Sequence, residues 1–224
     1  MNLKINNHKI ATILPYKESY TFKKASAVSL WVSEFYKKSV FRNNNIIYGN
    51  TNHSKYLTKN YVNITLDSLE FKFKSTSNEY VEKLIYELNK EKFDIIEIHN
   101  RPLVLLKLMV NIKAKYIIYY HNDPISMSGS KSVSERKEIL NKVERIVFIS
   151  KWVRDRFFKG LDDNLYHKTE IIYHSVEPRK KVEKSKYITF VGKLNHSKGY
   201  DIFKDAMLKI LDKFPQWKAL SVGD

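Results

Sequence analysis

Two lysines and a glycine lie where a short apolar run gives way to a helical pattern near the end of the chain. The run 188–191 is typical of a buried strand, and Gly192 allows a tight exit from it. Lys193 and Lys198 follow in a polar loop. A helix starting at Lys198 would turn its free N–H groups and the positive end of its dipole toward this loop. The spacing predicts a site for an anion such as a diphosphate, although a solvated basic loop would have the same sequence.

Three of the seven histidines each follow a predicted strand directly. They are His99, His121 and His174. Ligands bind beyond the carboxyl ends of parallel strands, so we expect these side chains to converge on one edge of a sheet. Asn100 and Arg101 come next after the first of them, and they can bind sugar hydroxyls and a carboxylate or phosphate, respectively. Taken singly, a histidine that caps a loop or an arginine in a surface salt bridge remains the alternative.

Several kinds of chemistry are excluded by what the sequence lacks. There is no cysteine, so disulfides, thiolate catalysis and cysteine-bound metals are ruled out. No Gly-x-Ser-x-Gly nucleophile motif occurs, and the lysine loop lacks the glycines of a dinucleotide-binding or Walker loop. The histidines do not have the helical spacing of metal ligands. We expect no metal and no bound cofactor.

Short apolar runs alternate with amphipathic stretches along the chain. This alternation predicts βαβ units, hence an α/β fold with a Rossmann-like, doubly wound parallel sheet. The expected strands are 9–14, 45–48, 93–99, 115–121, 145–150, 169–173, 188–191 and 217–222, and the expected helices include 78–91, 151–159 and 201–214.

A charged stretch without apolar periodicity, 177–186, indicates a linker. Residues 1–176 would then form one doubly wound domain. Residues 187–224 would form only the first β-α-β unit of a second Rossmann-like domain, which is too small to bury a stabilising core alone.

The chain has 224 residues and a formal net charge of +16, with 43% hydrophobic residues. The basic charge is either a bias of an AT-rich genome or an attraction to an anionic surface, such as lipid headgroups or nucleic acid. Aromatic residues between basic ones, such as Trp152, fall on the predicted buried face of a helix, so we expect no specific nucleic-acid partner. No run approaches the roughly 20 apolar residues of a membrane span, and the first residues lack a signal-peptide core. We therefore expect a cytoplasmic protein.

Five segments in sequence order resemble the GT-B fold glycosyltransferases of family 4, also called group 1. The most specific is 191–201, which is similar to the family's Gly-Arg-x-x-x-x-Lys-Gly donor motif with Lys193 in place of arginine. The others are 97–102, 120–124, 146–155 and 171–177.

The resemblance implies an acceptor-side domain followed by the start of a nucleotide-sugar-binding domain. It implies a retaining transfer of a hexosyl or N-acetylhexosaminyl group from a nucleotide-diphosphate sugar to a saccharide or lipid-linked acceptor. The setting would be lipopolysaccharide or other cell-surface polysaccharide assembly, on the inner face of the cytoplasmic membrane. Implied roles are catalysis for His121, donor diphosphate binding for Gly192, Lys193 and Lys198, and substrate binding for Asn100, Arg101 and Ser150.

Three departures from the family pattern weaken these expectations. The stretch 24–27 replaces a glycine-rich loop, and His174-Ser175 replaces Asn-Gly. The paired-glutamate motif would lie beyond Asp224, so we expect an incomplete donor site and an inactive or weakly donor-binding chain. Alternatives are a non-catalytic GT-B-like module that binds carbohydrate or a partner protein, a nucleic-acid-binding protein, and a nucleotide-sugar epimerase.

Overall fold

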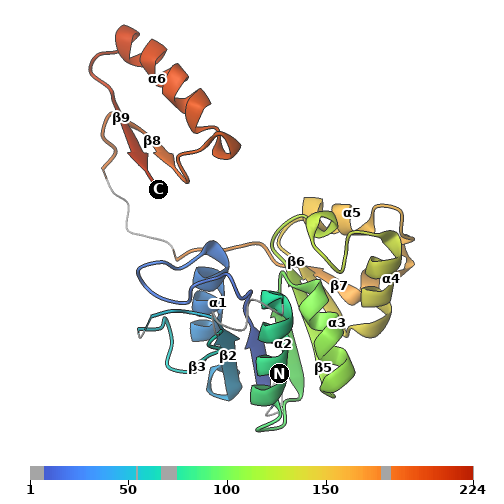
Figure 1. Cartoon of the computed structure of the whole chain (residues 1–224). Coiled ribbons are helices and arrows are strands. Elements are labelled where there is room, and N and C mark those ends of the chain that lie inside the picture. Colours follow the sequence, from blue (N-terminus) through green and yellow to red (C-terminus); the bar gives the residue numbers. More distant parts are fainter. Residues whose placement is uncertain (1–7, 54, 67–74, 178–182, 224) are drawn as a thin grey trace, which may run out of the picture. The chain divides into compact units, whose positions relative to one another are not determined.

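The structure is a computed structural model that describes residues 8–53, 55–66, 75–177 and 183–223. The chain divides into two compact units, residues 1–175 (unit 1) and 176–224 (unit 2) (Figure 1). Half of the predicted linker 177–186, residues 178–182, lies outside the described residues. The prediction that 187–224 begins a nucleotide-sugar-binding domain stays a prediction.

Unit 1 is built on a seven-stranded, all-parallel sheet with the order β3-β2-β1-β4-β5-β6-β7. Long apolar runs form its central strands β4 and β5, as expected for strands covered on both faces. The three-residue strand β3 was not among the predicted strands. The strands are Ile10–Ile13 (β1), Asn45–Gly49 (β2), Tyr61–Asn63 (β3), Ile95–His99 (β4), Lys115–Tyr120 (β5), Arg145–Phe148 (β6) and Thr169–Ile171 (β7).

Helices cover both faces of this sheet, which confirms the doubly wound α/β fold. Figure 1 shows α2 and α3 lying side by side over one face. The larger hydrophobic core lies between that face and helices α2 to α5, and a smaller core lies between the other face and α1. The helices of unit 1 are Ala27–Lys38 (α1), Thr76–Leu88 (α2), Pro102–Asn111 (α3), Val133–Lys142 (α4) and Lys151–Phe158 (α5), with 3-10 turns at Arg42–Asn44, Pro124–Ser126 and Asp163–Lys168.

Serine caps fix where four of these helices begin. The hydroxyls of Ser26, Ser75, Ser132 and Ser150 each accept the backbone N–H three residues later. Helix α2 therefore starts before the predicted cap at Asn78, because Ser75 already accepts the N–H of that asparagine.

The prediction that the aromatic residues of α5 face inward is wrong for one of them. Phe157 and Phe158 are buried, but Trp152 is 59% exposed. The guanidinium carbon of Arg156 lies 5.7 Å from its ring centroid, so the indole packs on a surface cation.

Unit 2 has the predicted β-α-β order. Strands Tyr187–Val191 (β8) and Lys218–Val222 (β9) pair in parallel, with helix Tyr200–Lys213 (α6) between them in sequence. Among its described residues only Met207 is a buried hydrophobic side chain. This agrees with the expectation that such a unit builds almost no core of its own.

Candidate functional site

Three histidines form a hydrogen-bonded row at the carboxyl edge of the sheet. His99 ends β4, His121 follows β5, and His174 comes three residues after β7. Nδ1 of His99 lies 2.8 Å from Nε2 of His121. Nδ1 of His121 lies 2.8 Å from Nε2 of His174. The structure thus brings together the three strand-end histidines that the sequence places at one edge.

Trp31 of helix α1 packs against all three rings. Its ring centroid lies 5.9 Å from that of His99, 5.3 Å from His121 and 5.5 Å from His174. This residue was missed, because the segment before it was interpreted as a replaced loop. The signal was present in the Ser26 cap and in the apolar spacing of Val28, Trp31 and Val32, which is that of one helix face.

The row runs from solvent into the protein, and burial keeps it uncharged. His99 and His121 are buried, whereas His174 is partly exposed. Burial lowers the pKa of His99 well below its usual value, and the neighbouring histidines add to this. Burial, with a smaller contribution from His174, lowers the pKa of His121 to about 3. The pKa of His174 is also lowered by partial burial. At neutral pH the row therefore consists of neutral imidazoles.

Neutral imidazoles in a row must share one tautomer. Each ring has one N–H donor and one bare nitrogen acceptor. The two hydrogen bonds can form only if all three rings carry the proton on Nδ1, or all three carry it on Nε2. Both ring nitrogens of His121 are thus occupied, while no described residue hydrogen-bonds to Nδ1 of His174. The catalytic role predicted for His121 stays a prediction, and a ring contact with substrate would require one of its two bonds to break.

Asn100 joins the ends of β4 and β5 rather than facing solvent. It is 2% exposed and has a φ of 52°, a left-handed conformation that asparagine tolerates better than most residues. Its Oδ1 accepts the backbone N–H of His121 at 2.7 Å, and its own N–H donates to the carbonyl of Tyr119 at 2.9 Å. This residue therefore fixes the backbone that carries His121.

Arg101 lines an open pocket of about 330 Å³ beside the histidine row. Its Nη1 donates to the Asn100 carbonyl at 2.8 Å, and its guanidinium carbon lies 5.3 Å from the Tyr16 ring centroid. Its Nε is buried and has no hydrogen-bond partner among the described residues. The side chain is thus held in place while its Nε–H remains available as a donor to a ligand.

Ser150 has a structural function in this arrangement. Its hydroxyl oxygen accepts the N–H of Val153 at 3.2 Å and so caps helix α5. An ion pair between Arg156 Nη2 and Asp123 Oδ2, 2.8 Å apart, ties the same helix to the loop after β5. The predicted contact of Ser150 with substrate is not needed to explain this residue.

The lysine loop of unit 2 differs from its predicted form. The turn His196–Lys198 is 3-10, Gly199 adopts a left-handed conformation with a φ of 72°, and α6 starts only at Tyr200. The predicted helix is therefore present, with Gly199 as its N-cap residue and Lys198 one residue before that cap. Lys193 and Lys198 are both exposed on the loop, and Gly192 donates its N–H to the Val222 carbonyl at 2.9 Å.

In the described residues, no group of three or more histidine, aspartate or glutamate side chains is placed to hold a metal ion. The histidine row itself bonds ring to ring instead of converging on a point. Over the same residues, no helix has both the length and the apolar character required to cross a membrane.

No family model matches the sequence. Over 156 residues it is 27% identical to the "putative glycosyltransferase YtcC" of Bacillus subtilis, which covers 61% of this chain and 38% of YtcC. The chain thus spans less than two fifths of that relative.

Two solved structures share the fold. Anabaena HepE in complex with UDP-glucose matches with a TM-score of 0.66 and 16% identity, over 97% of this chain and 61% of HepE. Sucrose-phosphate synthase from Thermosynechococcus elongatus matches with a TM-score of 0.68 and 13% identity, over 96% of this chain and 62% of that structure. At such identities the likeness shows the fold, which is the Rossmann-like fold of the GT-B glycosyltransferases.

Proposed function

We propose that this chain is part of a nucleotide-sugar-dependent glycosyltransferase, comprising its acceptor-side domain and the beginning of its donor domain. The observation that carries the proposal is the clustering of three histidines, Asn100 and Arg101 at the carboxyl edge of a GT-B sheet. Ligands bind at that edge in open parallel sheets. The similarity to YtcC supports the activity, and HepE, which shares the fold, binds UDP-glucose.

In the proposed reaction the bond between the anomeric carbon of the donor and the diphosphate oxygen breaks, and that carbon bonds to a hydroxyl oxygen of the acceptor. The hydroxyl proton passes to the leaving diphosphate, on which negative charge develops. Lys193 and Lys198 would stabilise that charge without a metal ion. The reaction would retain the anomeric configuration, as in family 4. His121 would lie beside the transferred sugar. Since burial lowers its pKa to about 3, it would act as a neutral hydrogen-bonding group and not as an imidazolium acid.

The proposed acceptor is a saccharide or a lipid-linked saccharide of a cell-surface polysaccharide such as lipopolysaccharide, and the transferred group is a hexosyl or N-acetylhexosaminyl unit. The proposed location is the cytoplasm, at the inner membrane face. The net charge of +16 supports attraction to an anionic leaflet there.

The donor assignment is tested by calorimetric titration of the chain with UDP-glucose and UDP. Lys198→Ala should weaken binding about 10- to 100-fold, because a charge-assisted hydrogen bond contributes about 1.5–3 kcal/mol. Lys209→Ala, an exposed lysine on α6, is the matched control and should leave the affinity unchanged. Equal affinities for the two variants would refute the phosphate site.

The second candidate is a non-catalytic GT-B-like module that binds carbohydrate without turnover. It is favoured by the occupation of both ring nitrogens of His121 by other histidines. Mass spectrometry of a nucleotide sugar incubated with the chain and an oligosaccharide acceptor separates the two. Release of nucleoside diphosphate with a matching mass gain on the acceptor supports the transferase. Binding of the oligosaccharide with no binding of UDP-glucose or UDP supports the module.

A further inference from the structure

The pocket next to the histidine row has a lining suited to an anion. Its wall comes from the loop after β1, the first turns of α2 and α3, and the turn after β5. It contains two cationic side chains, Lys17 and Arg101, and three serines, Ser77, Ser126 and Ser128. No carboxylate is among the described residues that line it. Asp123, on the same turn, is ion-paired with Arg156 instead.

Arg101 is the best-placed group for holding that anion. Its guanidinium is fixed by the Asn100 carbonyl and the Tyr16 ring, and no carboxylate of the described residues pairs with it. Its buried Nε has no acceptor. A buried donor without a partner is unfavourable, so a ligand oxygen that reaches Arg101 would remove a cost already present in the free protein.

The start of α3 adds backbone donors to the same wall. Unlike the serine-capped helices of unit 1, α3 has no side-chain cap and no acidic residue in its first turn. Leu103 and Val104, whose backbone N–H groups belong to that uncapped turn, both line the pocket. A Cβ at position 129 would lie 2.7 Å from the Leu103 nitrogen, so the loop backbone packs closely against the start of α3 and requires glycine there.

We propose that this pocket binds an oxyanion, a phosphoryl or carboxylate group, that is carried by a sugar substrate. Its volume of about 330 Å³ is at the small end of the range for ligand pockets, enough for one sugar unit and its charged group. Asn100 lines the pocket and also bonds the His121 backbone, so the charged group would be bound directly beside the histidine row. That the anion belongs to a substrate rests on the proposed transferase function, whereas the anion site itself does not.

The experiment is a titration of the isotopically labelled chain, followed through the Arg101 Nε–H and Leu103 amide signals. The probes are glucose 6-phosphate, glucuronic acid, neutral glucose and UDP. Both charged sugars should shift these signals with an affinity at least tenfold higher than that of glucose. UDP that shifts the same signals would support the pocket and identify the donor as the source of the anion. If UDP shifts only signals of unit 2, the source is the acceptor.

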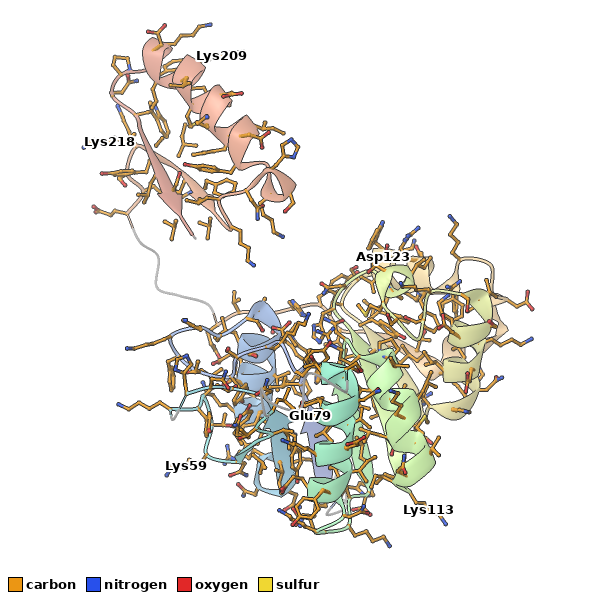
Figure 2. The ribbon with its side chains drawn as sticks, viewed as in Figure 1. Lys59, Glu79, Lys113, Asp123, Lys209 and Lys218 are labelled. Atoms are coloured by element: carbon orange, nitrogen blue, oxygen red, sulfur yellow. The ribbon has the colours of Figure 1, made fainter. Side chains whose placement is uncertain are left out.

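Matched variants separate a built site from general positive charge. Arg101→Gln should weaken binding of both charged sugars at least tenfold. Lys113→Gln should not, because Figure 2 shows Lys113 at the opposite end of unit 1 from Asp123. If Arg101→Gln does not fold, Lys17→Gln, on an exposed loop, takes its place and should weaken binding in the same direction.

The pocket assignment is overturned if glucose binds as tightly as the charged sugars, or if Arg101→Gln and Lys113→Gln weaken binding equally. Failure of the pocket is distinguishable from failure of the proposed function. Lys198→Ala tests UDP binding alone, so loss of one site leaves the measurement at the other intact.

Discussion

Replacing His121 by glutamine should remove part of the acid sensitivity of unit 1. The unfolded chain carries this histidine with a pKa near its ordinary value of 6.5, and the folded chain with a pKa of about 3. Between these values the unfolded state binds more protons than the folded state, so stability falls as the pH falls. Above pH 6.5 the buried His121 ring costs no stability. Below that pH the free energy of unfolding falls progressively, down to about pH 3.

The size of the effect follows from that window. Each pH unit below 6.5 costs about 1.4 kcal/mol while the folded ring stays neutral, so His121 removes about 2 kcal/mol of unfolding free energy by pH 5. His99, whose pKa is also lowered by burial, acts in the same direction. Wild type should therefore lose more than about 2 kcal/mol between pH 7 and pH 5, and His121→Gln about 2 kcal/mol less than wild type.

The assay is urea unfolding at both pH values, followed by the fluorescence of Trp31, which contacts the row. Trp152→Phe and Trp217→Phe in all samples leave this one indole, so that the signal reports unit 1 alone. His53→Gln, an exposed histidine, is the control and should keep the wild-type pH dependence. Equal losses of stability in wild type and His121→Gln would refute the neutral, buried row.

Three further substitutions test the packing of unit 1, each by urea unfolding monitored by circular dichroism. Trp31→Ala should cost about 3–5 kcal/mol, because it empties the space against the three histidines, whereas Leu30→Ala on the exposed side of α1 should cost little. Arg136→Met should cost about 3 kcal/mol or more, since this buried side chain serves four backbone carbonyls, and its exposed neighbour Lys137→Met should be near neutral. Ser150→Ala should lower the free energy of unfolding by about 1 kcal/mol through the lost cap. An additional loss of sugar binding in this variant would support the predicted contact of Ser150 with substrate.

The parts of the fold that were predictable are those where local pattern and tertiary burial agree. The central strands β4 and β5 are rich in isoleucine and tyrosine, and α6 has a regular apolar face. The short edge strand Tyr61–Asn63 has too few residues for a periodic signal. Helix α1 was missed for a different reason. Its cap and apolar spacing are present in the sequence, but the stretch 24–27 before it was interpreted only as a replacement for a glycine-rich loop.

The site was predictable at the level of strand ends and not at the level of contacts. Parallel strand order alone brings His99 and His121 to one edge. The ring-to-ring bonds depend on side-chain rotamers and on Trp31, which the missed helix supplies. The pocket could not be predicted, because Lys17, Ser77 and Arg101 come from segments far apart in the sequence.

The charges at the carboxyl edge separate into two regions. The histidine row is neutral at physiological pH, because burial and the adjacent imidazoles both oppose protonation. The neighbouring pocket is cationic through Lys17 and Arg101, and Asn100 contributes to both regions. A neutral polar region is suited to sugar hydroxyls, and a cationic one to an oxyanion. A ligand with both parts on one sugar would therefore match this edge better than a neutral sugar, which is the comparison that the titration of charged sugars against glucose makes.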